Sequence, residues 1–141
     1  MRHQKKGRKL NRNSSHRKAL FSNLASSLVL HKKIITTEAK GKELRKYIDR
    51  LVTYAKRGDL HGRRLIQKKI AGKRSKLVAN ILIHDIAPVF SNRNGGYTRM
   101  IKLNNRKNDN APITLVEFVD IESNSIEEKQ DTKEEKSKES K

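Results

Sequence analysis

The sequence predicts a small α+β domain of two layers, in which helices cover one face of a short sheet. Three observations carry this prediction. Apolar residues recur at three- and four-residue spacing in four segments between residues 15 and 87. Short stretches rich in strand-forming residues follow the first segment and close the body of the chain. Only 33% of the 141 residues are hydrophobic, so the core is expected to be small.

The first helix is expected over residues 15–31, after an extended basic arm over residues 1–13 that shows no hydrophobic period. Ser14 or Ser15 is expected to cap this helix, because a serine hydroxyl accepts a backbone N–H bond at a helix start. Its apolar stripe is made of Leu20, Phe21, Leu24, Ala25 and Leu28. The β-branched run 34–37 is too short for a helix and predicts a strand.

A second helix is expected to begin after Thr37, which stands where a capping residue belongs. It should end near Gly58, since glycine readily takes the left-handed conformation that follows many helices. The expected buried stripe is Leu44, Ile48, Leu51 and Ala55, with Tyr47 and Tyr54 at its margins.

Two more helices complete the helical layer. Asp59 is expected to cap the first, a weak helix that ends near Ile70 and contains Gly62 in its first turn. Ser75 is expected to cap the second, which should end before Pro88 because proline disfavours helix in the residue before it. Its expected apolar side is Leu77, Val78, Ile81, Leu82 and Ile86.

The body is expected to close with two antiparallel strands, over residues 97–103 and 113–119, joined by the polar loop 104–112. The element order is then helix, strand, three helices and two strands, forming a globular domain over residues 14–120. Residues 121–141 are almost entirely polar and charged, which predicts a disordered tail; a charged single helix is the alternative.

The charge of the chain points to a polyanionic partner. The formal net charge is +19, and the first 37 residues hold ten Lys or Arg and no acid. Such a segment repels itself unless dense negative charge lies against it, and phosphate backbones supply that charge. An anionic membrane surface is the competing partner, but no Trp is present and no apolar run approaches the roughly 20 residues of a membrane span. The sequence therefore predicts a soluble, cytoplasmic nucleic-acid-binding protein.

Enzymatic and metal-binding functions find little support in the residues. The chain has no cysteine, and its five histidines show no metal-ligand spacing. Glu43 and Asp49 lie six residues apart, on different faces of a helix, and no nucleophile elbow or phosphate-binding glycine loop is present. We expect no catalytic site, cofactor, metal or small-molecule substrate.

Two segments allow both a binding and a structural interpretation. The cations Lys68, Lys69, Lys73 and Arg74 form a phosphate clamp if bound and a solvated face if not; the charge of the body favours the clamp. After two glycines, Tyr97 and Arg99 either project together as a stacking ring beside a phosphate fork, or Tyr97 lies in the core. Neither late strand has the paired aromatic residues of an RNA-recognition sheet, so backbone and shape recognition is expected.

Several motifs follow one another along the chain: Met1-Arg2-His3, Gly7-Arg8-Lys9-Leu10-Asn11-Arg12, Ser15-His16-Arg17, Thr36-Thr37, Lys42-Glu43-Leu44-Arg45, Gly95-Gly96-Tyr97-Thr98-Arg99 and Asp109-Asn110-Ala111-Pro112. In sequence and spacing they resemble the L-seventeen family of bacterial large-subunit ribosomal proteins, over residues 1 to about 120. Two positions depart from the family pattern. Gly41 stands where alanine is more frequent and should soften its helix, and Asn108 stands where glycine is common, which leaves the turn geometry open.

The resemblance implies a structural protein of the large ribosomal subunit, present in single copy, that binds large-subunit ribosomal RNA near the peptide exit tunnel beside neighbouring ribosomal proteins and supports assembly. A basic chromosomal DNA-compacting protein is the alternative that charge alone permits. From charge and resemblance together, the residues expected to bind RNA are Arg2, His3, Lys5, Lys6, Arg8, Lys9, Arg12, His16, Arg17, Lys68, Lys69, Lys73, Arg74, Arg93, Tyr97 and Arg99.

Overall fold

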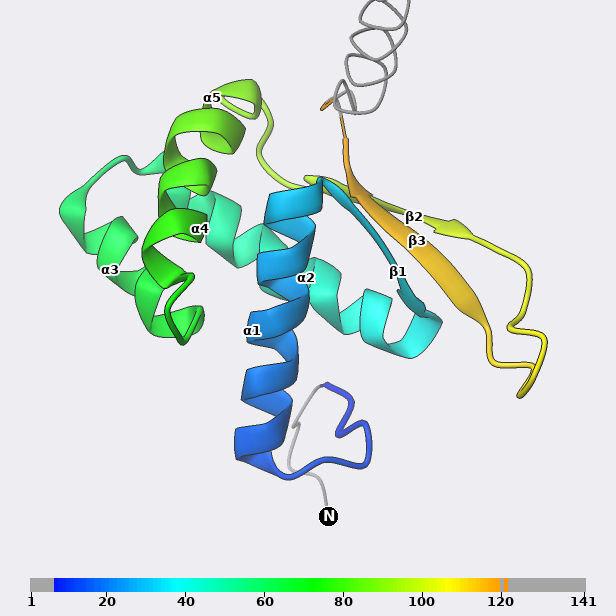
Figure 1. Cartoon of the computed structure of the whole chain (residues 1–141). Helices are drawn as coiled ribbons and strands as arrows, with labels where there is room; N and C mark the ends of the chain where they lie inside the picture. The colour runs from blue at the N-terminus through cyan, green and yellow to red at the C-terminus, as the bar shows by residue number, and fades with distance from the viewer. Residues whose placement is uncertain (1–6, 120, 122–141) are drawn as a thin grey trace, which may run out of the picture.

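The computed structural model describes residues 7–119 and Ile121, so the predictions made for residues 1–6 and for the tail from residue 122 onward lie outside the described residues. The elements follow the order α1 (Ser14–His31), β1 (Lys33–Thr37), α2 (Glu38–Lys56), α3 (Leu60–Lys69), α4 (Ser75–Ile81), a π-helical turn η1 (Leu82–Ile86), α5 (Ala87–Val89), β2 (Thr98–Lys102) and β3 (Ile113–Phe118). Figure 1 shows the helices gathered on one side of a small sheet. The predicted α+β class is confirmed.

The three strands form an antiparallel sheet in the order β1-β3-β2, so the last strand of the sequence lies in the centre. Leu115 of β3 lies opposite Ile35 of β1 and Ile101 of β2. Helix α2 packs against all three strands, and it covers the face that carries Val116 and other buried residues. The opposite face is open, since the side chain of Ile35 is 65% exposed.

The core lies between α2, the remaining helices and the covered face of the sheet. The predicted stripe of α2 is fully buried, as are the anchors of the later helices: Leu44, Ile48, Leu51, Ile66, Ile70, Val78, Leu82 and Ile86. The prediction that Leu77 lies on the apolar side of its helix is wrong. Val78 and Ala79 face the core, so Leu77 points outward and is 52% exposed. Ile121, assigned by its sequence to the tail, is half-buried and packs against the core.

The helix caps differ from the predicted ones at two starts. Asn13 caps α1, since its Oδ1 accepts the N–H of His16 at 2.8 Å, whereas Ser14 and Ser15 were expected to do so. An asparagine at this position satisfies a free N–H of the first turn as well as serine does. Arg74 precedes α4, so the predicted cap Ser75 is instead the first helical residue.

The other two predicted caps lie where expected. Asp59 precedes α3, and its Oδ1 accepts the N–H of Gly62. Thr37 precedes α2, although its side chain makes no capping hydrogen bond. Gly58 takes a left-handed φ of 67° after α2, as predicted.

The last long helix does not end before Pro88. The chain widens into the turn η1, in which the N–H of Ala87 donates to the carbonyl of Leu82, and then continues through α5. Proline lacks an N–H and its ring clashes with the carbonyl four residues earlier in a regular α-helix. A wider π turn immediately before Pro88 accommodates both features, and the helical path therefore extends to Val89.

The two positions that depart from the family pattern have different consequences in the fold. A Cβ on Gly41 would lie 2.8 Å from Cγ2 of Thr114, so this glycine allows α2 to approach β3 closely. In the loop between β2 and β3, the left-handed residue is Asn110, with φ of 50°, and not Asn108. Asparagine tolerates this conformation, so the loop needs glycine neither at position 108 nor at position 110.

An ion pair closes the loop between β2 and β3. The guanidinium of Arg106 donates to both carboxylate oxygens of Asp109, over Nε–Oδ1 and Nη2–Oδ2 distances of 2.8 and 2.6 Å. The backbone N–H of Arg106 donates to the carbonyl of Ala111, which brings the two sides of the loop together. Arg106, with the weaker backbone bond from Ala111, lowers the pKa of Asp109 to about 2.

We expect a carbon NMR titration of the Asp109 carboxylate to give a midpoint near pH 2 instead of the ordinary 3.8. Because folding lowers this pKa, the ion pair stabilises the loop fully at pH values above the ordinary pKa of 3.8. This stabilisation is lost as the pH falls through about 2. Arg106→Gln should return the midpoint close to the ordinary value, while Lys107→Gln, the control, should leave it near 2. An unchanged midpoint in Arg106→Gln would show that another group lowers this pKa.

Candidate nucleic-acid interface

Two of the predicted basic segments meet at one end of the molecule. The turn after α3 is attached to the first two helices: the N–H of Ala71 donates to Oγ of Ser22 on α1 at 3.0 Å. The hydroxyl of Tyr47 on α2 donates to the carbonyl of Lys69 at 2.6 Å. These bonds hold the turn beside the N-terminal half of α1, which continues directly from the arm (Figure 1).

We call this end of the molecule the arm-end face. The described cations and histidine that make it up are Arg8, Lys9, Arg12, His16, Arg17, Lys46, Arg50, Lys68, Lys69, Lys73 and Arg74. All are exposed except Arg12 and Arg17, which are half-buried. Their positive charge faces solvent, and phosphate oxygens are the groups that such a surface binds best.

The described part of the arm is folded back and not extended as predicted. Leu10 and Asn11 have left-handed φ values of 54° and 50°, and the N–H of Arg12 donates to the carbonyl of Lys9. Two consecutive positive φ angles produce a tight turn of the kind found in hairpins. The guanidinium of Arg17 then donates to the carbonyl of Arg12 at 3.0 Å, which fixes the turn against α1.

The third predicted group lies elsewhere in the fold. Tyr97 is 2% exposed and packs edge-on against Phe90, with ring centroids 5.2 Å apart. Arg99 pairs with Glu117 on the open face of the sheet. The carbonyl of Arg93 accepts a hydrogen bond from Nζ of Lys56. None of these three residues therefore lies on the arm-end face.

The expectation that Tyr97 and Arg99 share one face of a strand is wrong. Strand β2 begins at Thr98, so Tyr97 precedes it and is free to turn inward. Within the strand, Thr98 is buried and Arg99 is exposed, as strand alternation requires. Of the two alternatives for Tyr97, the structure supports the core ring.

The sequence reasoning missed a row of cations on α2. Lys42, Lys46 and Arg50 follow one another at four-residue spacing, which places them along one side of the helix, and all three are exposed. That spacing was the available signal. A second signal was the segment 60–84, which holds seven Lys or Arg and no acid. Lys46 and Arg50 of this row, and Lys68, Lys69, Lys73 and Arg74 of this segment, belong to the arm-end face.

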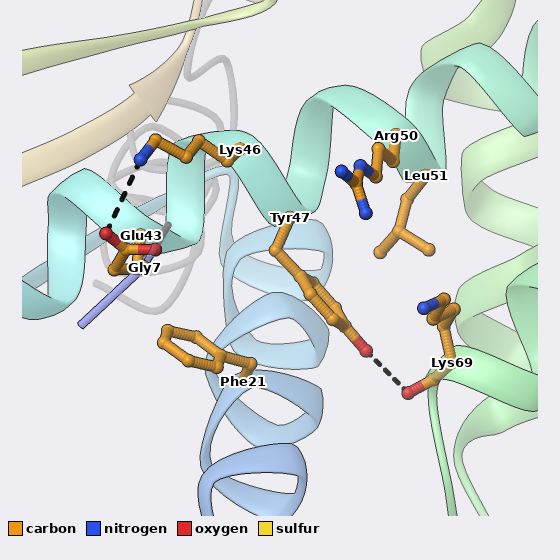
Figure 2. Close-up of a pocket in the computed structure, with 8 residues that line it drawn as sticks. All are labelled: Gly7, Phe21, Glu43, Lys46, Tyr47, Arg50, Leu51 and Lys69. Carbon is orange, nitrogen blue, oxygen red and sulfur yellow. Dashed lines mark hydrogen bonds and ion pairs between the residues drawn. The ribbon is translucent and has the colours of Figure 1, made fainter. Parts of the chain in front are cut away.

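A cavity of about 410 Å³ opens where the arm at Gly7, α1, α2 and the end of α3 meet. Figure 2 shows the rings of Phe21 and Tyr47 at its centre, between Glu43 on one side and Arg50 and Lys69 on the other. The two rings are stacked, with centroids 6.0 Å apart and an angle of 26° between their planes. Burial raises the pKa of Tyr47, which keeps its hydroxyl protonated as the donor to Lys69. We call this cavity the ring pocket.

One acid lines the ring pocket. Nζ of Lys46 lies 3.5 Å from Oε1 of Glu43, and both residues belong to α2. On the neighbouring side of the helix, the pKa of Asp49 is raised above its ordinary value, chiefly by burial. A hydrogen bond from the backbone of Tyr97 and the charge of Arg45 oppose this rise. Cations outnumber acids around the ring pocket and around a neighbouring cavity that Arg8, Lys42 and Arg45 line together with Asp49.

The described residues offer no metal-binding arrangement at this end. Across residues 7–119 and Ile121, no three His, Asp or Glu side chains gather closely enough to hold a metal ion. Within the same part of the chain, no helix is long and apolar enough to cross a membrane. The arm-end face is a charged surface with one aromatic cavity, suited to binding a polyanion.

Comparison with known proteins agrees with the resemblance seen in the motifs. A family model described as Ribosomal protein L17 matches residues 20–119. Three curated relatives share the name Large ribosomal subunit protein bL17. The relative from Syntrophotalea carbinolica is 52% identical over 86% of this chain and 77% of its own length. The relative from Allorhizobium ampelinum is 51% identical over 85% of this chain and 83% of its own length. The relative from Desulforapulum autotrophicum is 54% identical over 84% of this chain and 97% of its own length. Because a family model covers most of the folded domain and relatives above half identity cover most of the chain, the chain belongs to the ribosomal protein L17 family.

Proposed function

We propose that this chain binds large-subunit ribosomal RNA through its arm-end face and holds RNA segments together during assembly of the subunit. As a member of its family, the chain is a structural, non-enzymatic constituent of the bacterial large ribosomal subunit in the cytoplasm. Its position near the peptide exit tunnel, its contacts with neighbouring ribosomal proteins and its presence in single copy are proposals that rest on the resemblance.

The observation that carries the proposal is the joining of two basic segments by specific hydrogen bonds. Tyr47 and Ser22 hold the end of α3, which carries Lys69, and the turn after it, which carries Lys73, beside α1, so cations distant in sequence form one surface. A rigid set of cations selects phosphates by their spacing, which differs between a folded RNA and a regular duplex. The histidine His16 and the exposed Arg8 and Lys9 extend this surface along the arm.

The remaining predicted residues enter the proposal in different ways. Arg2, His3, Lys5 and Lys6 lie outside the described residues and are proposed as further contacts through the resemblance. Arg93 and Arg99 are proposed as contacts separate from the arm-end face. Tyr97 supports the domain from its core and is not proposed to touch RNA.

We expect rRNA binding by the full chain to weaken steeply with salt. Each phosphate contact contributes roughly −0.7 to −0.9 to the slope of log affinity against log salt concentration. The double variant Lys69→Gln with Lys73→Gln should make this slope shallower by about 1.5, because two contacts are removed. Filter binding of transcribed large-subunit rRNA between low and moderate KCl concentrations measures both slopes.

The matched control removes the same charge from another part of the fold. Lys102 and Lys107 are exposed cations of β2 and the loop that follows, and neither is among the residues that make up the arm-end face. Lys102→Gln with Lys107→Gln should change the slope less than the first pair. Equal losses in the two double variants would indicate that total charge, and not this surface, governs binding. If duplex DNA bound as tightly as rRNA, the DNA-compacting function would replace the proposed one.

A further inference from the structure

We propose that the ring pocket receives a single unstacked nucleotide of the ribosomal RNA, with its base against Phe21 and Tyr47. The proposal rests on the proposed rRNA binding and adds a specific subsite to it. A nucleotide combines a flat aromatic base with an anionic phosphate, so it requires a ring surface and cations at one place. Among the described residues, the ring pocket brings these two kinds of group together.

The dimensions of the cavity suit a ligand of this size. Its volume of about 410 Å³ lies within the roughly 300–1,000 Å³ that is typical of small-molecule sites. The side chains of Phe21 and Tyr47 are half-buried, so their rings are supported from below and still line the open space. A base of any type has a face that can stack on such rings.

The platform is held in place before any ligand arrives. The hydroxyl of Tyr47 donates to the carbonyl of Lys69 at 2.6 Å, and the ring of Phe21 stacks against Tyr47 from α1. The Tyr47 ring is thereby fixed at both its edge and its face. A ring that does not have to be ordered on binding retains more of its stacking energy as affinity.

The charges around the rings give the nucleotide one orientation. Figure 2 shows Lys69 beyond the hydroxyl end of Tyr47 and Arg50 on the same side of the ring, whereas Glu43 lies with Lys46 and Gly7 on the side of Phe21. A phosphate is attracted toward Arg50 and Lys69, because a guanidinium and an ammonium both bind phosphate oxygens. The base edge then faces Glu43, whose carboxylate accepts hydrogen bonds from amino groups of bases.

The test uses the full chain, transcribed large-subunit rRNA and variants of the two rings. Tyr47→Leu and Phe21→Leu should each weaken rRNA binding roughly 10- to 100-fold, the range that loss of one stacked base produces. Because neither variant removes charge, the salt slope should stay that of the wild-type chain. Tyr54→Leu is the matched control, since Tyr54 is a half-buried tyrosine of α2 outside the pocket, and it should bind like the wild type.

Tyr47→Phe separates stacking from the attachment of the turn. This variant keeps the ring but loses the hydrogen bond to Lys69, so it should bind rRNA more weakly than the wild type, because the turn is attached less firmly, yet more tightly than Tyr47→Leu, which also loses the ring. An affinity as low as that of Tyr47→Leu would overturn the inference in favour of a purely structural role for the hydroxyl. Thermal melts of every variant identify any that fail to fold, and Phe21→Leu then carries the test without affecting that hydrogen bond.

Ultraviolet cross-linking supplies an independent measurement. Irradiation of assembled large subunits, followed by digestion and mass spectrometry, should recover a nucleotide attached to a peptide that contains Phe21 or Tyr47. If the wild-type chain binds rRNA with a steep salt slope but both leucine variants bind equally well, the ring pocket is not a nucleotide site. If the wild-type chain shows no salt-dependent rRNA binding, the proposed function itself fails.

Discussion

Gly62→Ala is expected to destabilise the domain by about 2 kcal/mol, because the new methyl group would collide with a neighbouring backbone. A Cβ at this position would lie 2.5 Å from the carbonyl oxygen of Tyr54 and 2.7 Å from Oδ1 of Asp59. A carbonyl in the body of α2 cannot move aside as a flexible side chain can. The gain in helix propensity on replacing glycine by alanine, about 1 kcal/mol, offsets only part of this cost.

The measurement is a thermal or urea melt of the full chain, in which the midpoint of Gly62→Ala should fall by roughly 10 °C. Gly95→Ala is the matched control, since no atom lies within 4 Å of its added Cβ and its φ is not left-handed. That variant should be unchanged or stabilised by about 0.4–1 kcal/mol through its less flexible unfolded chain. Equal midpoints for the two alanine variants would mean that α2 and α3 do not approach as closely as described.

Gly62 also shows why part of the fold escapes prediction from the sequence. By local propensity this glycine only weakens the first turn of α3, and that is how the sequence presents it. In the structure it is the point at which α3 comes close to α2. Helical spacing reveals which residues of one helix face inward, but the contact between two helices depends on where the chain places them.

The same distinction applies to the sheet and to the interface. Alternating strand formers predicted β2 and β3 as neighbours, but the pairing of β1 with β3 joins residues about 80 positions apart, as in Ile35 and Leu115, and no local pattern records it. The basic arm and the turn near Lys69 were each visible as charge. They meet through two hydrogen bonds, one that Tyr47 donates to the carbonyl of Lys69 and one that Ser22 accepts from the N–H of Ala71. In the sequence, both side chains appeared only as ordinary members of helices.

The arrangement of the aromatic residues could not be predicted from the sequence for a related reason. Composition shows only six of them, and strands that lack aromatic pairs argue against an RNA-recognition sheet. The pair that forms in the structure comes from two helices, because Phe21 and Tyr47 lie on facing sides of α1 and α2. The ring expected at the interface, Tyr97, lies in the core instead.

That reversal leads to the second large effect, which we expect from Tyr97→Ala. Removing a buried aromatic ring leaves a cavity and typically costs about 3–5 kcal/mol, a large share of the roughly 5–15 kcal/mol by which small domains are stable. The Tyr97 ring contacts Phe90, and Nζ of Lys56 lies 5.7 Å from its centroid, so both neighbours would lose a partner. We expect Tyr97→Ala to lower the midpoint of a urea melt sharply or to prevent folding.

Tyr97→Phe distinguishes a core role from an RNA contact, because it keeps the ring and removes only the hydroxyl. A core ring predicts that Tyr97→Phe melts close to the wild type and binds rRNA with unchanged affinity and salt slope. The loss of binding in Tyr97→Ala should then follow the loss of folded protein, as circular dichroism and filter binding on the same samples would show. A Tyr97→Ala chain that stayed folded but bound rRNA weakly would instead assign the ring to the RNA, and would require the segment before β2 to turn outward in the complex.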